Sequence, residues 1–179
     1  MLLTMKRAAQ SGVTLIELMV AVAILGVLIK LVLPTFLTQA HKAEGDSEVA
    51  AFFAELTAKE EQYKVDHGVY LSTGTSETNT WPTAPKASLQ SITPLPTTWS
   101  TLRVVTPSSQ VRCAYVAIAG TATTGTVGTV ASSSFGFVKP SRSWYYVLAQ
   151  CNLSGQSGKY SYYFASSLDA RVQKLNWGE

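Results

Sequence analysis

The sequence predicts an α+β protein in which one long N-terminal helix carries an antiparallel β-sheet head. Three observations indicate this fold. The chain opens with a near-unbroken apolar run over residues 12–28. Apolar residues then recur at three- and four-residue spacing as far as His67, which is the period of an amphipathic helix. Beyond residue 100, short β-branched and aromatic runs alternate with turn-rich segments, which is typical of antiparallel strands.

The N-terminal run suits a membrane-spanning stem. A helix over residues 13–33 would be about 31 Å long, which matches the ~30 Å hydrocarbon core of a bilayer. Near its outer end, Lys30 can extend its ammonium group to the interface. Near its start, Glu17 is a functional candidate, because a charge in hydrocarbon costs roughly 2.5–3.5 kcal/mol. Lys6 and Arg7 precede the run, so the positive-inside rule keeps the N-terminus in the cytoplasm and exports the rest.

Two simpler interpretations of this N-terminus remain open. An ordinary secretory signal has the same order of basic, apolar and small residues, with a passable cleavage site at residues 38–40. Its leading region would be unusually long, however, and an acid would precede the apolar centre. A plain membrane anchor without cleavage is the other interpretation.

Residues 12–17, Gly-Val-Thr-Leu-Ile-Glu, closely resemble the processing site of type IV pilins and pseudopilins. The resemblance implies that residues 1–12 are a leader, which a prepilin peptidase removes between Gly12 and Val13 before it methylates Val13. Residues 13–40 would then be the hydrophobic stem, which spans the membrane and later forms the fibre core. Glu17 would attract the α-amine of Val13 in an adjacent subunit, and a pair within one chain is the alternative.

The resemblance continues along the stem with two departures. Gly26 and Pro34 stand where pilins commonly carry a glycine and a proline, and the proline is expected to kink the helix or relax its hydrogen bonding. Val13 replaces the usual phenylalanine, and Lys30 brings a charge to a position that is usually apolar. The candidate residues for subunit assembly are Thr14, Glu17, Gly26 and Pro34.

The globular head is expected over residues 41–179. It should contain an amphipathic helix over residues 41–67, an irregular connection over residues 68–100, and an antiparallel sheet over residues 101–176. Strands are expected at residues 102–105, 111–119, 143–151, 160–165 and 171–175. The helix is expected to pack on the sheet through one apolar stripe, which consists of Ala43, Val49, Phe52, Phe53, Leu56 and Tyr63.

Charge and cysteines add two expectations about the head. Residues 41–67 are net acidic and residues 68–179 are net basic. This asymmetry would either attract neighbouring subunits to one another or reflect a solvated helix face. The chain has two cysteines, Cys113 and Cys151, both in the exported part. An even count in an oxidising compartment favours one disulfide between them, and two buried free thiols are the alternative.

No catalytic motif is present, so the sequence favours a structural protein without cofactor or metal over an enzyme. The resemblance implies a type IV pilus subunit, held in the inner membrane and polymerised with other copies by an inner-membrane assembly platform. The resulting extracellular fibre would serve adhesion, motility or uptake.

Two alternatives remain within the same family. The first is a pseudopilin of a type II secretion system. Major pseudopilins typically bind calcium through acidic loop residues, of which this head has few: Glu77, Asp169 and Glu179. The second is a minor pilin that binds nucleic acid through basic head residues, for which the candidates are Arg103, Arg112, Lys139 and Arg142.

Overall fold

The computed structural model describes residues 13–175, so the expected leader, residues 1–12, lies outside the described residues. The chain divides into two compact units, Met1–Leu37 and Thr38–Glu179. The helix α1 (Leu15–His67) begins in the first unit and ends in the second, and its helical backbone continues through Pro34. The predicted long helix is therefore confirmed. It ends at His67 because Gly68 follows with φ +80°, a conformation that glycine adopts without steric cost.

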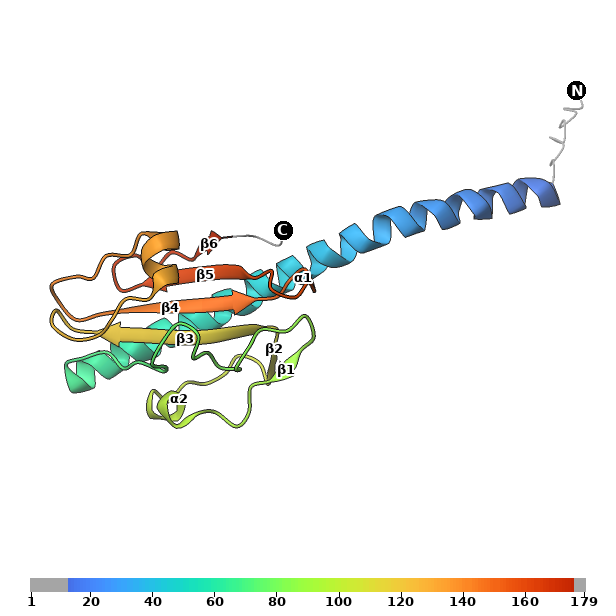
Figure 1. Cartoon of the computed structure of the whole chain (residues 1–179). Helices are drawn as coiled ribbons and strands as arrows, with labels where there is room; N and C mark the ends of the chain where they lie inside the picture. Colours follow the sequence, from blue (N-terminus) through green and yellow to red (C-terminus); the bar gives the residue numbers. More distant parts are fainter. Residues whose placement is uncertain (1–12, 176–179) are drawn as a thin grey trace, which may run out of the picture. The chain divides into compact units, whose positions relative to one another are not determined.

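The head contains a four-stranded antiparallel sheet with strand order β3-β4-β5-β6 (Figure 1). Its strands are β3 (Cys113–Gly120), β4 (Trp144–Cys151), β5 (Ser161–Ser166) and β6 (Gln173–Leu175). A separate two-stranded ribbon pairs β1 (Gln90–Ser91) with β2 (Gln110–Val111). The α+β prediction is confirmed, and the last three predicted strands are shifted by at most two residues.

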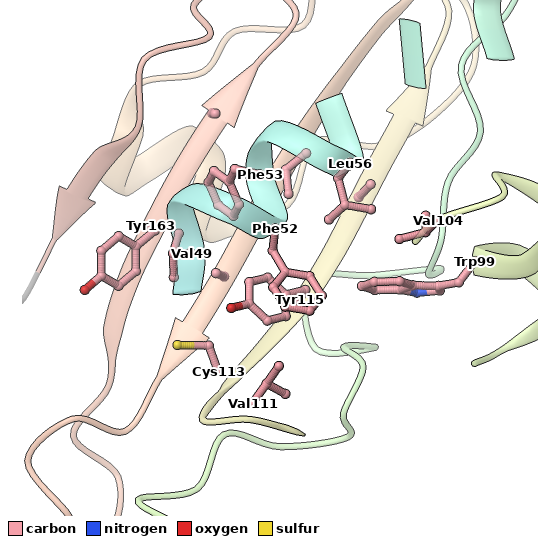
Figure 2. Close-up of a cluster of buried hydrophobic side chains, with 14 of the residues drawn as sticks. Val49, Phe52, Phe53, Leu56, Trp99, Val104, Val111, Cys113, Tyr115 and Tyr163 are labelled. Carbon is pink, nitrogen blue, oxygen red and sulfur yellow. The ribbon is translucent and has the colours of Figure 1, made fainter. Parts of the chain in front are cut away.

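One face of the sheet packs on the second half of α1. The buried α1 side chains Val49, Phe52, Phe53 and Leu56 belong to the same core as alternate residues of β3, β4 and β5. Figure 2 shows Phe52 against the ring of Tyr115, with ring centroids 4.5 Å apart. The expected stripe is correct over these four residues. Ala43, which the stripe also included, is exposed, and Tyr63 is only partly buried.

The opposite face of the sheet carries a second core, which is largely aromatic. Trp144, Tyr146 and Phe164 point to this face and are covered by the segment around the π-helix η1 (Val130–Ser134). The carboxylate of Glu77 accepts hydrogen bonds from the backbone N–H groups of Val130 and Ala131, both at 2.8 Å. The aromatic residues of β4 and β5 thus serve to pack both faces of the sheet.

The strand predicted over residues 102–105 is wrong. A short helix, α2 (Thr97–Thr101), stands just before it, and Pro96 precedes that helix at a position where its missing N–H costs no hydrogen bond. Leu102 and Val104 are buried in the main core without joining a strand, and Arg103 between them has φ +54°. The spacing of the apolar residues therefore predicted the burial of Leu102 and Val104 correctly, but it did not predict their backbone conformation.

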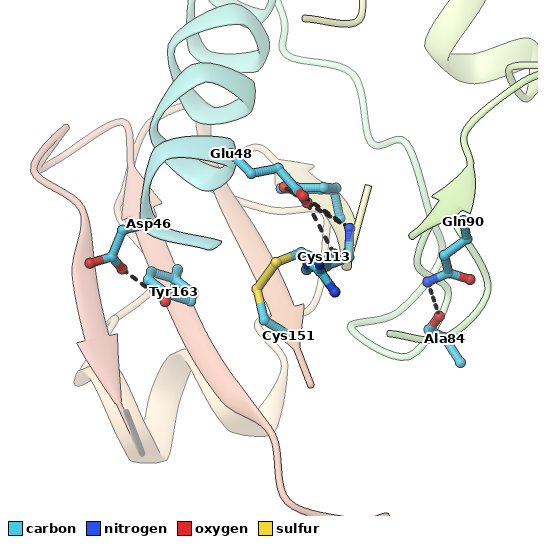
Figure 3. Close-up of a disulfide and its surroundings, with 9 residues drawn as sticks. Asp46, Glu48, Ala84, Gln90, Cys113, Cys151 and Tyr163 are labelled. Atoms are coloured by element: carbon cyan, nitrogen blue, oxygen red, sulfur yellow. Dashed lines mark hydrogen bonds between the residues drawn. A yellow bond between two sulfur atoms is a disulfide. The ribbon is translucent and has the colours of Figure 1, made fainter. Parts of the chain in front are cut away.

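The carboxylate of Glu48 fixes α1 to the start of β3 (Figure 3). It accepts hydrogen bonds from the backbone N–H groups of Arg112 at 2.9 Å and Cys113 at 3.0 Å. It also accepts one from the Tyr115 hydroxyl at 2.7 Å. Burial, with this carboxylate beside it, raises the pKa of Tyr115 well above its ordinary value, so the hydroxyl remains a donor. Because Arg112 bonds to Glu48, the predicted strand over residues 111–119 is divided into β2 and β3.

Other α1 carboxylates also bind the same head. Asp46 accepts from the Tyr163 hydroxyl at 2.9 Å and from the Lys174 ammonium at 2.7 Å. Four further acids of α1 also contact the head. Glu44 pairs with the Arg112 guanidinium at 3.0 Å, and Glu55 accepts a hydrogen bond from the Val105 N–H at 2.8 Å. Glu60 accepts from the Leu71 N–H at 3.0 Å, and Glu61 accepts from the Tyr70 hydroxyl at 3.0 Å. Most acids of this segment thus have a partner in their own head, while Glu44, Glu61 and Asp66 remain exposed to solvent.

Gly45 has a packing role in α1. A Cβ at this position would lie 2.7 Å from Leu153 Cδ2. The segment after β4 therefore approaches the helix closely because residue 45 lacks a side chain.

The predicted disulfide is confirmed. Cys113 and Cys151 are direct partners in the β3–β4 register, and their Sγ atoms are bonded at 2.01 Å. Both residues are fully buried. The bond ties the first residue of β3 to the last residue of β4, beside the Glu48 contact.

We expect loss of this disulfide to destabilise the head. The bond closes a loop with a sequence separation of 38, for which chain-entropy estimates give about 3–4 kcal/mol. Replacing both cysteines by alanine should lower the free energy of unfolding by about that amount. Urea unfolding of the full chain in detergent, followed by tryptophan fluorescence, measures the change. An unchanged midpoint would show that the sheet does not depend on the bond.

We expect Glu48→Ala to lower the free energy of unfolding by about 2–3 kcal/mol, because it strands two N–H donors and a buried hydroxyl. Glu48→Gln should cost less, since its amide oxygen still accepts. Asp66→Ala is the matched control: Asp66 is an exposed acid of the same helix, so its loss should change stability by less than about 0.5 kcal/mol. Equal effects of Glu48→Ala and Asp66→Ala in the same unfolding assay would contradict this role.

Candidate functional site

The first half of α1 presents an apolar surface that nothing in the described chain covers. Residues Leu15–Leu33 have a mean hydropathy of 2.6, and none of this segment is buried. At 1.5 Å per residue the segment is about 28 Å long, close to the thickness of a bilayer core. By length and composition it can cross a membrane, and it needs either lipid or protein around it.

Two charged side chains interrupt this surface, Glu17 near its start and Lys30 near its end. The backbone N–H of Glu17 donates to the hydroxyl of Thr14 at 3.3 Å, so Thr14 caps the first turn of α1. The Glu17 carboxylate is exposed and makes no hydrogen bond or ion pair with another described residue. Its place in the first turn is favourable, because the helix dipole stabilises negative charge there. The carboxylate is therefore available to a group from outside the described chain.

Of the two remaining stem candidates, Gly26 has no packing role within the described chain. A Cβ added at Gly26 would meet nothing within 4 Å, so no contact within the chain requires a glycine there. Small residues on an apolar helix allow a second helix to approach its backbone closely. Pro34 lies within the continuous helix α1. Val13, just before α1, is 71% exposed, whereas the expected cleavage partner Gly12 lies outside the described residues.

The two described acidic loop residues of the head, Glu77 and Asp169, are engaged in local contacts, and Glu179 lies outside the described residues. Glu77 bonds to Val130 and Ala131, as described above. Both carboxylate oxygens of Asp169 accept from the Arg171 guanidinium, at 2.9 Å and 3.1 Å, and this interaction lowers the pKa of Asp169. Within residues 13–175, no group of three or more His, Cys, Asp or Glu side chains is close enough to hold a metal ion.

Two of the four basic residues that the sequence singled out for nucleic acid are also occupied. The Arg112 guanidinium bonds to Glu44 and to the Ala87 carbonyl. The Lys139 ammonium donates to the Gly125 carbonyl at 3.2 Å. Arg103 and Arg142 are exposed. Two of the four candidate residues for nucleic-acid binding therefore already donate hydrogen bonds to acceptors of their own head.

The chain resembles known proteins at its N-terminus and over part of its length. Residues 7–29 match the family model described as the prokaryotic N-terminal methylation motif. Type II secretion system core protein G of Pseudomonas aeruginosa is 40% identical over 72 residues, which are 38% of this chain and 48% of that protein. The protein of the same name from Vibrio cholerae is 39% identical over 83 residues, which are 45% of this chain and 56% of that protein.

The chain thus spans about half the length of the curated relatives it matches. No solved structure matches the chain significantly. The methylation motif and the one apolar helix together indicate that the N-terminus is anchored in a membrane. With its long apolar helix, its antiparallel sheet, this motif and this homology to secretion pseudopilins, the chain is similar to type IV pilin-like proteins.

Proposed function

We propose that this protein is a structural subunit of a type II secretion pseudopilus. It is held in the inner membrane by the stem of α1 and polymerises with other pilin-like subunits through that stem. The observation that carries the proposal is the stem itself: an apolar helix with no buried residue over Leu15–Leu33, most of which falls within the methylation motif of residues 7–29. The similarity to secretion-system core protein G favours the pseudopilus over a pilus.

A type IV pilus subunit is the second candidate, with an extracellular fibre that serves adhesion, motility or uptake. One observation favours it. The pseudopilin resemblance implies calcium held by acidic loop residues, yet the described loop acids Glu77 and Asp169 already bind donors of their own head. Both candidates share the same stem, processing and assembly, so the experiments below separate them only at the last step.

We expect a prepilin peptidase to cut between Gly12 and Val13 and to methylate the new N-terminus. Cleavage there frees the apolar helix at its first residues and gives Val13 an α-amine one turn from Glu17. Mass spectrometry of the membrane-extracted protein should find N-methyl-valine as the first residue. A mature chain that begins after Ala40 would instead support an ordinary signal peptide, and an unprocessed chain would support a plain anchor.

We expect Glu17→Ala to block assembly while leaving processing and membrane insertion intact. In a fibre core both the Glu17 carboxylate and the Val13 amine would be poorly solvated, so each needs a partner of opposite charge. Cells that carry only the variant should accumulate processed protein in the membrane and form no filaments by electron microscopy. The control Asp66→Ala removes an exposed acid from the other end of α1 and should assemble normally. Abundant filaments built only from Glu17→Ala protein would contradict this role.

A strain that lacks the protein distinguishes the two filaments. Loss of exoprotein secretion in a deletion strain, with surface pili unaffected, supports the pseudopilus. Loss of surface pili with normal secretion supports the pilus and overturns our first choice.

A further inference from the structure

Glu60 is a buried carboxyl group with one unused oxygen. It lies in the last third of the amphipathic half of α1 and is 0% exposed. Its Oε2 atom accepts a hydrogen bond from the backbone N–H of Leu71 at 3.0 Å. Its Oε1 atom is buried and has no hydrogen-bond partner among the described residues. A fully ionised carboxylate in this place would lack the solvation that its second oxygen requires.

The bond from Glu60 holds the beginning of a segment that covers the free edge of β3. Ser72 Oγ donates to the Ala119 carbonyl at 3.2 Å and accepts from the Ala119 N–H at 2.8 Å. Thr73 bonds to Ala117 in the same way: its N–H donates to the Ala117 carbonyl at 2.8 Å, and its Oγ1 accepts from the Ala117 N–H at 2.8 Å. Residues 71–73 therefore form an edge-covering segment, which is fixed to α1 at Leu71 and to β3 at two further residues.

The groups around Glu60 do not provide a dedicated positive charge. Glu61, its neighbour on α1, is acidic and accepts from the Tyr70 hydroxyl. The Lys64 ammonium, one turn further along α1, donates to that same hydroxyl at 2.9 Å and stands 4.5 Å from the centre of the Tyr70 ring. Tyr145 approaches from β4, and burial raises its pKa, so it stays neutral at physiological pH. The neutral form of Glu60 thus fits these surroundings better than the charged form.

We propose that Glu60 is a proton-operated latch for the edge-covering segment. In its protonated form it keeps Leu71 against α1 and so holds residues 71–73 along β3. Loss of the proton places an unsolvated charge beneath this segment, and water reaches Oε1 only when the segment moves away from α1. The open form exposes the N–H and C=O groups of Ala117 and Ala119 on the edge of β3. The latch belongs to the head alone and does not depend on the proposed filament.

The pH at which the latch acts follows from the burial of the group. Burial raises the pKa of Glu60 from 4.5 to about 8; the Leu71 N–H opposes this rise, and the charge of Glu61 adds to it. The folded chain therefore keeps a proton that the unfolded chain releases. This contribution to stability is complete below pH 4.5, declines as the pH rises, and is lost once the pH passes about 8.

Hydrogen exchange of the full chain in detergent tests the latch directly. Native protein and Glu60→Gln are compared at each pH between about 6 and 9, so that the intrinsic dependence of exchange on pH cancels. Glutamine keeps the shape and the acceptor but cannot ionise, so the variant should remain closed throughout. At about pH 9 we expect the amides of Leu71, Thr73, Ala117 and Ala119 to exchange about a thousandfold faster in the native protein than in Glu60→Gln. The reason is that the pKa of Glu60 falls from about 8 to its ordinary value of 4.5 when the segment opens, and each unit of that fall changes the opening equilibrium about tenfold.

The control is Glu61→Gln, which removes the neighbouring but exposed acid and should retain most of the native pH dependence. Identical exchange of native protein and Glu60→Gln across the range would overturn the proposal. If Glu60→Gln does not fold, infrared spectroscopy of the native chain decides instead. A protonated carboxyl band that persists near pH 7 and disappears above about pH 8 supports the latch, and the absence of that band at pH 7 overturns it.

Discussion

The head of this protein depends on carboxylates that border an apolar helix stripe. The stripe around Phe52 and Leu56 provides most of the favourable free energy, since each buried large apolar side chain contributes about 1.5–3 kcal/mol. Packing a helix against the first residues of β3 also buries backbone N–H groups that have no strand partner. Glu48 satisfies two of them and the Tyr115 hydroxyl at once. The apolar stripe thus drives the docking of α1, and the carboxylates fix its position along the sheet.

This use of the acids limits how the chain can meet other copies of itself. Six acids of α1, from Glu44 to Glu61, already accept hydrogen bonds from groups of their own head, so the head fixes where these side chains point. The stem retains Glu17 and an extended apolar surface. Because lipid tails are as apolar as the side chains of this surface, stems that leave the membrane gain free energy from close packing against one another. Apolar packing would therefore supply the affinity of assembly, and Glu17 its register.

The sequence predicted those features that follow from local period and composition. The stem, the end of α1 at His67, the strands β4 and β5 and the Cys113–Cys151 bond all belong to this class. The strand predicted over residues 102–105 was wrong because alternating apolar residues indicate burial alone. A loop that enters the core shows the same pattern as a strand. The roles of Glu48 and Glu60 could not be predicted either, since their partners lie in loops that become neighbours only in the folded head. The sequence offers only a weak indication of these roles, which is that both acids lie beside the apolar stripe of the helix and not opposite it.

Structural analysis of the assembled state tests the central claim that α1 is at once the spine of the head and the element of assembly. Electron cryomicroscopy of filaments sheared from cells that overproduce the protein is the most direct measurement. The account predicts that the helix over Leu15–Leu33 lies in the filament core, in contact with the stems of other copies, while the head retains the Glu48 contact to β3. Filaments in which this helix faces solvent, or in which heads alone form the contacts, would contradict it.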